Sequence, residues 1–245
     1  MTKPKMILFD YGDTLCAESD VDFLRGYEAL MPYIKRNKNN LTPQQINNFD
    51  QEMYDKIAGD IHDIGYEVHE WPLLRFTYEY LGIELSISIP EAEMILWNAA
   101  SPGAVMPRAD KMLDYINARG IRSGVISNIG WSGAALTERI NRFLPRNRFE
   151  FILASSEYIF RKPSPMLFNL ALRKAGLNAS DVWFCGDNII CDVEGAAAVG
   201  IFPVWYEELS MENPLRLQNN GAVPKVEHLY IHDWDEMIDA LERLE

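Results

Sequence analysis

The apolar positions of the chain follow two different periods, and the change between them divides the sequence into three parts. A continuous apolar run at Met6–Phe9 predicts a buried strand. From there to about Ala100, apolar residues recur at steps of three and four, which predicts helices. After Pro107, short apolar runs alternate with helical patterns, which is the arrangement of βαβ units. We therefore predict an α/β fold in which a parallel sheet has helices on both faces and a helical block follows the first strand.

The helical block has recognisable start and stop signals. Thr42 before Pro43 is typical of an N-cap followed by proline in the first turn, and Gly82 is typical of a helix end. Only Glu84–Ile89 shows a strand-like alternation. The expected helices of the block are one containing Phe23, Tyr27, Leu30, Met31 and Ile34, then Pro43 to about Ile61, Trp71–Leu81 and Pro90–Ala99.

The alternating part supplies the rest of the predicted sheet. Its expected helices cover Arg108–Arg119, Gly133–Phe143, Pro165–Ala175, Asp192–Val199 and Trp234–Leu244. Its expected strands cover Ser123–Ser127, Phe151–Ala154, Val182–Cys185, Ile201–Trp205 and His228–Ile231. Boundaries near Glu18 and near Ser101 predict two units, a core of residues 1–17 and 104–245 and a helical unit of residues 18–103.

Composition narrows the classes of function. The 245 residues are 48% hydrophobic and 24% charged, which is enough apolar material for a full core. The net charge of −13 disfavours a nucleic-acid partner and an anionic membrane surface. The three cysteines have no short paired spacing, and no apolar run is long enough for a signal peptide or a membrane span. We therefore expect reduced thiols and a cytoplasmic protein, and the sequence leaves the oligomeric state open.

Unusual polar residues follow several of the predicted strands. In an open parallel sheet, ligands bind at the carboxyl ends of the strands, so these residues are expected to meet at one edge. Three carboxylates beside a lysine are costly unless a cation offsets their charge, and Mg²⁺ prefers such oxygen ligands. A carboxylate in that setting can attack phosphorus, while lysine and metal offset the charge on the transferring group. The residues are Asp10, Ser127, Asn128, Lys162, Asp187 and Asp192.

The order of these residues resembles that of the haloacid dehalogenase superfamily of hydrolases, over nearly the whole chain. Its four motifs are similar to Ile7–Leu15, Gly124–Asn128, Arg161–Pro165 and Phe184–Asn188, the last followed by Asp192. The resemblance implies a Rossmann-like core in which the inserted block is a helical cap of the C1 type. It also implies that substrate is held between core and cap.

The resemblance further implies a role for each motif residue of a Mg²⁺-dependent phosphatase acting on a small phosphorylated metabolite. Asp10 would be the nucleophile that forms an aspartyl-phosphate. Ser127, Asn128 and Lys162 would serve catalysis by binding and orienting the phosphoryl group. The implied Mg²⁺ ligands are Asp10, the carbonyl of Gly12, Asp187 and Asp192.

The sequence departs from the family pattern at Gly12. Phosphatases of the family usually carry an aspartate there, which protonates the leaving group and then activates water. Gly12 keeps a carbonyl for the metal but has no side chain for proton transfer, a contribution typically worth about 10²–10⁴ in rate. Asp13, one residue later, either substitutes for that group or stabilises its own turn.

This departure leaves two alternatives to the phosphatase. The 2-haloacid dehalogenases of the superfamily also lack the second aspartate, but they lack the Gly-Asp of the fourth motif, which is present here as Gly186-Asp187. The other alternative is a non-catalytic binding or regulatory protein. Near the motifs, Trp131 either lines the substrate pocket or packs in the core, and Tyr11 could shape the leaving-group site. Two arginines of the helical block, Arg25 and Arg75, are expected at the surface rather than at the substrate.

Overall fold

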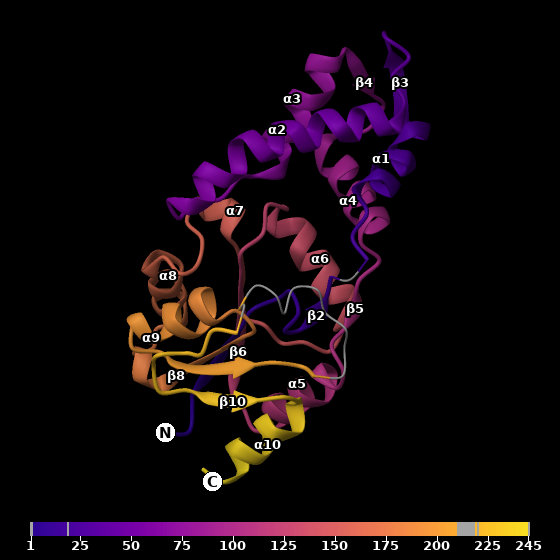
Figure 1. The fold of residues 1–245 in the computed structure, drawn as a ribbon. Coiled ribbons are helices and arrows are strands. Elements are labelled where there is room, and N and C mark those ends of the chain that lie inside the picture. Colours follow the sequence, from indigo (N-terminus) through magenta and orange to yellow (C-terminus); the bar gives the residue numbers. More distant parts are fainter. Residues whose placement is uncertain (1, 19, 210–218, 220, 245) are drawn as a thin grey trace.

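The computed structural model describes residues 2–18, 20–209, 219 and 221–244, and a parallel six-stranded sheet forms its centre (Figure 1). The strand order is β10-β9-β8-β1-β6-β7, so β1 lies inside the sheet with β8 and β6 beside it. No helix among the described residues is both long and apolar enough to cross a membrane. The strands are β1 (Met6–Phe9), β6 (Arg122–Ser127), β7 (Ile152–Ala154), β8 (Val182–Gly186), β9 (Phe202–Tyr206) and β10 (Leu229–Ile231).

Helices cover both faces of the sheet, as the alternation of the sequence predicts. The side chains of β1 point to the two faces in turn, and all four are buried. Ile7 and Phe9 pack with α5 (Ala109–Ala118), α6 (Gly133–Phe143) and α10 (Trp234–Glu242). Met6 and Leu8 pack with α8 (Pro165–Ala175) and α9 (Gly195–Ala198) on the other face.

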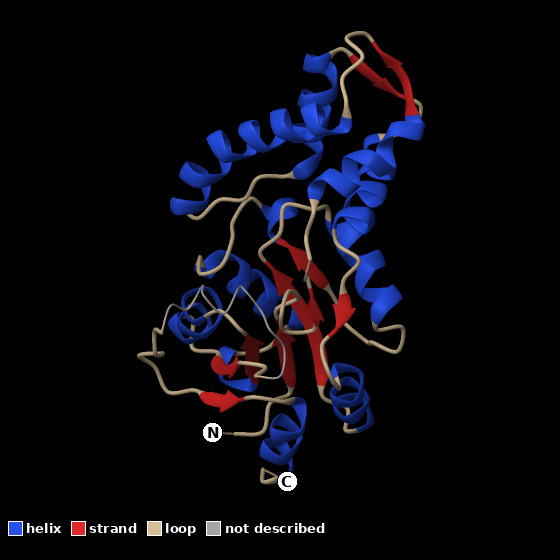
Figure 2. Cartoon of the chain, turned by 45° about the vertical axis from the view of Figure 1, so that its right-hand side comes forward, coloured by secondary structure: helices blue, strands red, loops and turns tan. Residues whose placement is uncertain are grey.

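The helical block lies beyond the carboxyl ends of the strands (Figures 1 and 2). Its longest helix begins as predicted, because Thr42 and Gln45 form a capping box next to Pro43. Gly82 ends another helix in the left-handed conformation, with φ of 70°. The helices are α1 (Phe23–Leu30), α2 (Pro43–Asp63), α3 (Glu70–Leu81) and α4 (Ile89–Ala100).

One helix prediction within the block is wrong at its end. Ile34 is not helical, because α1 passes into a 3₁₀ turn over Met31–Tyr33 that contains a proline. Ile34 instead starts β3 (Ile34–Asn37), which pairs antiparallel with β4 (Ile83–Leu85). The strand-like alternation at Glu84–Ile89 thus indicated a real but shorter strand.

The core departs from the predictions at four short elements. The expected helix Asp192–Val199 is a π-helical turn over Ile189–Glu194 followed by α9. Two-residue strands β2 (Cys16–Ala17) and β5 (Ala104–Val105) pair where the chain leaves and re-enters the core, and α7 (Ser155–Tyr158) follows β7. Such short elements leave no periodic pattern in a sequence. Of the two predicted units, residues 1, 19, 210–218, 220 and 245 lie outside the described part.

Candidate active site

Three neighbouring strands bring the predicted polar residues to one edge of the sheet. Phe9 pairs with Cys185 of β8 on one side and with Val125 of β6 on the other. Asp10, the next residue, therefore stands beside the end of β8, and its backbone N–H donates to the Cys185 carbonyl at 2.9 Å. Ser127 ends β6 and Asp187 follows β8, so both reach the same edge.

Lys162 joins this edge from the loop before α8. Its Nζ lies 2.6 Å from Asp10 Oδ1 and 2.6 Å from Asp192 Oδ1, and only 2% of its side chain is exposed. Asn128 holds the lysine in place through the main chain. The Asn128 Nδ2 donates to the Lys162 carbonyl at 2.8 Å, and the Lys162 N–H donates to Asn128 Oδ1 at 2.7 Å. Both ends of the Asn128 amide thus position the lysine loop.

Asp192 reaches the edge because Gly186 leaves room for it. A Cβ on Gly186 would lie 2.4 Å from Asp192 Cγ, closer than non-bonded atoms approach. The Asn188 N–H donates to Asp192 Oδ2 at 3.0 Å and orients the carboxylate. The π-helical turn over Ile189–Glu194 brings Asp192 back over the end of β8.

The charges of this group do not balance. We call Asp10, Lys162, Asp187 and Asp192 the rim cluster; it holds three carboxylates and one lysine. Burial, together with the charge of Asp192, raises the pKa of Asp10 to about 6, although Lys162 opposes the shift. Burial and the charges of Asp192 and Asp10 raise the pKa of Asp187 well above its usual value. Burial alone would lower the pKa of Lys162, but Asp10 and Asp192 raise it.

The rim cluster suits a hard divalent cation. Asp10, Asp187 and Asp192 each offer an oxygen, and these three oxygens lie within 4.8 Å of one another. Carboxylate oxygens are the ligands that Mg²⁺ prefers, and the excess negative charge is what such an ion would offset. The donor set therefore fits the ion that the sequence predicts.

The loop after β1 shows what Gly12 and Asp13 contribute. Both residues line the cavity at the rim. A Cβ on Gly12 would meet no atom within 4 Å, so the missing side chain leaves open space. Asp13 has φ of 53°, and its N–H donates to the Cys16 carbonyl at 2.7 Å. Asp13 therefore shapes its own turn and also borders the site, and both interpretations made from the sequence stay open.

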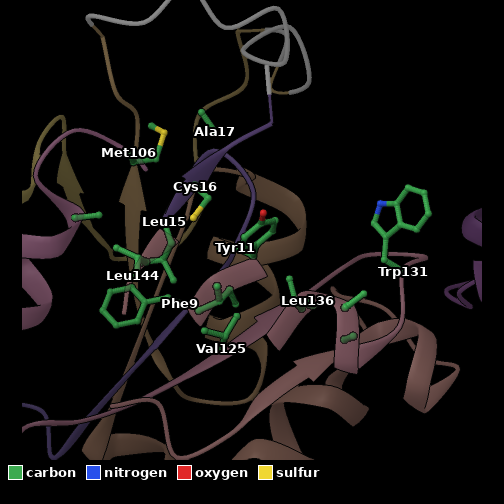
Figure 3. Close-up of a cluster of buried hydrophobic side chains, with 14 of the residues drawn as sticks. Phe9, Tyr11, Leu15, Cys16, Ala17, Met106, Val125, Trp131, Leu136 and Leu144 are labelled. Carbon is green, nitrogen blue, oxygen red and sulfur yellow. The ribbon is translucent and has the colours of Figure 1, made fainter. Parts of the chain in front are cut away.

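The cavity beside the rim cluster has a volume of about 370 Å³ and extends toward the helical block. Ser127, Trp131 and Tyr11 line it. Trp131 also packs in the buried core cluster, so both of its sequence interpretations describe part of its position. Figure 3 shows Trp131 on the loop after β6, set apart from the side chains around Phe9. Arg25 and Arg75 do not line this cavity in the described part of the chain; Arg25 pairs with Asp20 at 2.9 Å and Arg75 is exposed.

A second buried charged group, which the sequence analysis did not predict, borders the same cavity. We call Tyr11, Glu18, Ser101 and Arg139 the hinge cluster. The fully buried Arg139 of α6 lies 2.9 Å from Glu18 Oε1, and it donates to the Tyr11 hydroxyl at 2.9 Å and to the Ser101 carbonyl at 2.6 Å. The Tyr11 and Ser101 hydroxyls both donate to Glu18. Glu18 lies where the chain leaves the core for the helical block, and Ser101 lies where the chain returns. We call these two segments the chain crossings; Arg139 binds both of them to α6 of the core.

Comparisons with known proteins agree with this geometry. A family model described as haloacid dehalogenase-like hydrolase matches residues 4–200. The chain is 27% identical over 172 residues to haloacid dehalogenase-like hydrolase domain-containing protein 3 of Mus musculus, covering 69% of this chain and 65% of that protein. It is 29% identical over 102 residues to glyceraldehyde 3-phosphate phosphatase of Pyrococcus abyssi, covering 42% of each chain. These matches span about two thirds or less of the relatives' own length.

Solved structures share the fold over the full chain. A HAD phosphatase from Thermococcus onnurineus superposes with a TM-score of 0.63, 16% identity and 98% coverage of both chains. A 2-haloacid dehalogenase from Pseudomonas syringae pv. Tomato DC3000 superposes with a TM-score of 0.61, 20% identity and 100% coverage of both. Because both chemistries occur on this fold, the residues of the site must decide between them.

Proposed function

The chain belongs to the haloacid dehalogenase-like hydrolases, and on that basis we propose that it is a Mg²⁺-dependent phosphatase of small phosphate monoesters. One observation carries the proposal: Lys162 bridges Asp10 and Asp192 at 2.6 Å each, whereas Asp187 forms no ion pair with a lysine or arginine in the described part of the chain. A site built only for attack on carbon gains nothing from two further buried carboxylates next to its nucleophile. A site built for phosphoryl transfer uses them to hold a cation.

In this proposal Asp10 is the nucleophile. Its carboxylate oxygen forms a bond to phosphorus while the bond from phosphorus to the leaving oxygen breaks, which yields an aspartyl-phosphate and an oxyanion that takes a proton from water to become the free alcohol. Water then attacks phosphorus, releases inorganic phosphate and restores Asp10. Lys162 holds Asp10 for attack and offsets charge on the phosphoryl oxygens, to which Ser127 donates from the end of β6. Asn128 acts on the reaction by positioning the lysine loop.

Asp10, Asp187, Asp192 and the Gly12 carbonyl would hold the Mg²⁺. When bound, the ion would offset the negative charge of both the rim cluster and the phosphoryl group. We further propose that residues 18–103 act as a cap, because this block covers the carboxyl edge of the sheet and encloses one side of the cavity.

Hydrolysis of 4-nitrophenyl phosphate with and without Mg²⁺ tests the proposal. We expect Mg²⁺-dependent release of phosphate by the natural chain and a loss of at least about 10³-fold in Asp10→Asn. The exposed Asp110→Asn is the matched control and should keep full activity. Full activity of Asp10→Asn would remove Asp10 as nucleophile. If Mg²⁺ binds but no phosphate is released, chloride release from a 2-haloacid distinguishes a dehalogenase from a non-catalytic protein.

The open space at Gly12 gives a second test. Without an acid at this position, substrates with good leaving groups should react faster than alkyl phosphates. Gly12→Asp has room for its side chain and should raise turnover of an alkyl phosphate at least about tenfold, whereas Gly12→Asn should not. A rate that is independent of the leaving group and falls in Asp13→Asn would instead assign the proton transfer to Asp13.

A further inference from the structure

The cavity has two chemically different halves. One half is the rim cluster, where the phosphoryl group would react. The other part of the lining includes three aromatic side chains that we call the aromatic wall: Phe23 of α1, Trp97 of α4 and Trp131 after β6. Two of the three come from the helical block, so the wall exists only where that block meets the core. In a phosphatase of this geometry, the wall faces the leaving group.

The aromatic wall is packed in a fixed arrangement. The rings of Trp97 and Trp131 stack at 5.2 Å with 11° between their planes, and Phe23 stacks on Trp131 at 6.3 Å. The Arg139 guanidinium lies 4.6 Å from the centre of the Trp97 ring. Trp97 and Trp131 are 3% and 9% exposed. An apolar surface already held in place binds an apolar group without first losing side-chain freedom.

The charged groups around the wall are already paired. Glu18 is bound to Arg139 at 2.9 Å. Arg161, which also lines the cavity, pairs with the buried Glu67 of the helical block at 3.2 Å. The remaining cation among the described lining residues, Lys162, is bound to Asp10 and Asp192. A second anionic group on a substrate would therefore have to compete with these carboxylates for a cation.

The hydroxyl groups of this half are used internally as well. Tyr11 and Ser101 both donate to Glu18, and Arg139 donates to both of these residues. A substrate rich in hydroxyl groups would have to break these bonds or leave its own groups unpaired, and each unpaired buried polar group costs about 1–3 kcal/mol. The wall therefore disfavours polyol leaving groups.

From these contacts we infer the substrate class: phosphate esters and acyl phosphates whose leaving group is uncharged, apolar and ring-bearing. This inference rests on the proposed phosphatase function and adds the leaving group to it. It agrees with the open space at Gly12, because neither leaving group needs a proton from the enzyme: an aryl oxygen departs as a phenolate that takes a proton from water afterwards, and an acyl oxygen departs as a stable carboxylate.

Two matched pairs of substrates test the inference, with phosphate release measured in Mg²⁺ and corrected for spontaneous hydrolysis. Benzoyl phosphate and acetyl phosphate both carry acyl leaving groups, so they differ mainly by the ring. We expect kcat/KM at least about tenfold higher for benzoyl phosphate, chiefly through KM. Phenyl phosphate and 4-carboxyphenyl phosphate differ by the charge of one carboxylate. We expect kcat/KM to be at least about tenfold lower for the carboxylated ester.

Variants of the wall connect this selectivity to its residues. In Trp131→Leu the preference for benzoyl over acetyl phosphate should fall by roughly three- to tenfold, as expected for the loss of one aromatic contact. Phe23→Leu should also lower the preference for benzoyl over acetyl phosphate. Because Phe23 is 39% exposed, this substitution should have little effect on folding. Phe76→Leu, at an exposed aromatic residue of α3 outside the cavity, is the control and should keep the preference.

Three outcomes would contradict the inference, and one of them also contradicts the function. Equal kcat/KM for the two acyl phosphates would show that the wall does not bind the leaving group. Faster reaction of 4-carboxyphenyl phosphate would show that Arg161 is available to an anion. Release of phosphate from neither acyl phosphate, with Mg²⁺ present, would overturn the proposed phosphatase together with this inference.

Discussion

The rim cluster and the hinge cluster are both buried charged groups, yet they are built in opposite ways. In the rim cluster, three carboxylates share one lysine, and burial and mutual repulsion raise the pKa values of Asp10 and Asp187. In the hinge cluster, one arginine faces one carboxylate, and Arg139 donates to Glu18, Tyr11 and Ser101. Both groups border the cavity, but the first carries excess charge, whereas the second is balanced and tightly bonded.

The difference indicates what each cluster is for. A balanced, fully hydrogen-bonded ion pair holds two chain crossings against α6 and leaves nothing over for a ligand. An unbalanced cluster is unfavourable for folding, and it fits the proposed binding of a cation and a phosphoryl group. Substitutions should therefore damage stability at the hinge and activity at the rim.

The largest effect is expected from breaking the hinge pair. Arg139→Met leaves Glu18 without its cation in a mostly buried place and should lower the free energy of unfolding by about 3–5 kcal/mol. Urea unfolding measures this change. Arg142→Met, on the exposed side of the same helix, should be nearly neutral. Adding Glu18→Gln to Arg139→Met should recover part of the loss; no recovery would contradict the role of charge pairing.

At the rim, removing the lysine should act on turnover. Lys162→Met takes away the cation beside Asp10, and we expect a fall of about 10²–10³ in kcat, or about 2.7–4 kcal/mol in the barrier. Steady-state hydrolysis of 4-nitrophenyl phosphate measures it. The exposed Lys174→Met is the control. An unchanged kcat with only a higher KM would mean that Lys162 binds the substrate without acting on the reaction.

A smaller and opposite effect on stability is expected from Asp187→Asn. Because burial and the neighbouring carboxylates raise the pKa of Asp187, its ionised form is unfavourable in the folded state without metal. The amide should raise the free energy of unfolding by about 1–2 kcal/mol in the absence of Mg²⁺. If Mg²⁺ binds as proposed, it stabilises the natural chain, and Asp187→Asn should abolish that stabilisation. The exposed Asp239→Asn should change neither; a less stable Asp187→Asn would contradict the picture of an unbalanced rim.

The smallest effect is a pH dependence from a carboxyl group inside the helical block. Burial, with Asp50 and Glu93 nearby, raises the pKa of Glu70 from 4.5 to about 8. The folded chain thus holds a proton that the unfolded chain releases in this range. The contribution of protonated Glu70 to the free energy of unfolding is complete below about pH 4.5 and is lost as the pH rises to about 8.

For this partly exposed side chain we expect a loss of about 1 kcal/mol over that range. Urea unfolding at several pH values measures it. Glu70→Gln should flatten the dependence, and the exposed Glu79→Gln should leave it in place. A stability that rises with pH and is unaffected by Glu70→Gln would contradict the assignment.

The sequence by itself determined the elements whose signals are local. The continuous apolar run at Met6–Phe9 marked a strand buried on both faces, and Thr42 and Gly82 marked helix ends, because capping depends on neighbours a few residues away. The motif residues were found in the same way. Each follows a strand or precedes a helix, and parallel strands place their carboxyl ends at one edge, so their meeting place followed from the order of elements.

Tertiary structure decided what depends on residues far apart in the chain. The helical spacing of Leu136, Arg139 and Ile140 places Arg139 on the buried face of α6, but its partner Glu18 is set by how α6 packs against the chain segments that join the core to the helical block. Ile34 continued a helical period, yet its pairing with Leu85 placed it in a strand. Phe23, Trp97 and Trp131 form one wall only where the helical block closes on the core. Local signals determine the secondary-structure elements and the positions of the motifs. Charge balance and the shape of a cavity depend instead on residues that are far apart in the sequence and meet only in the folded chain.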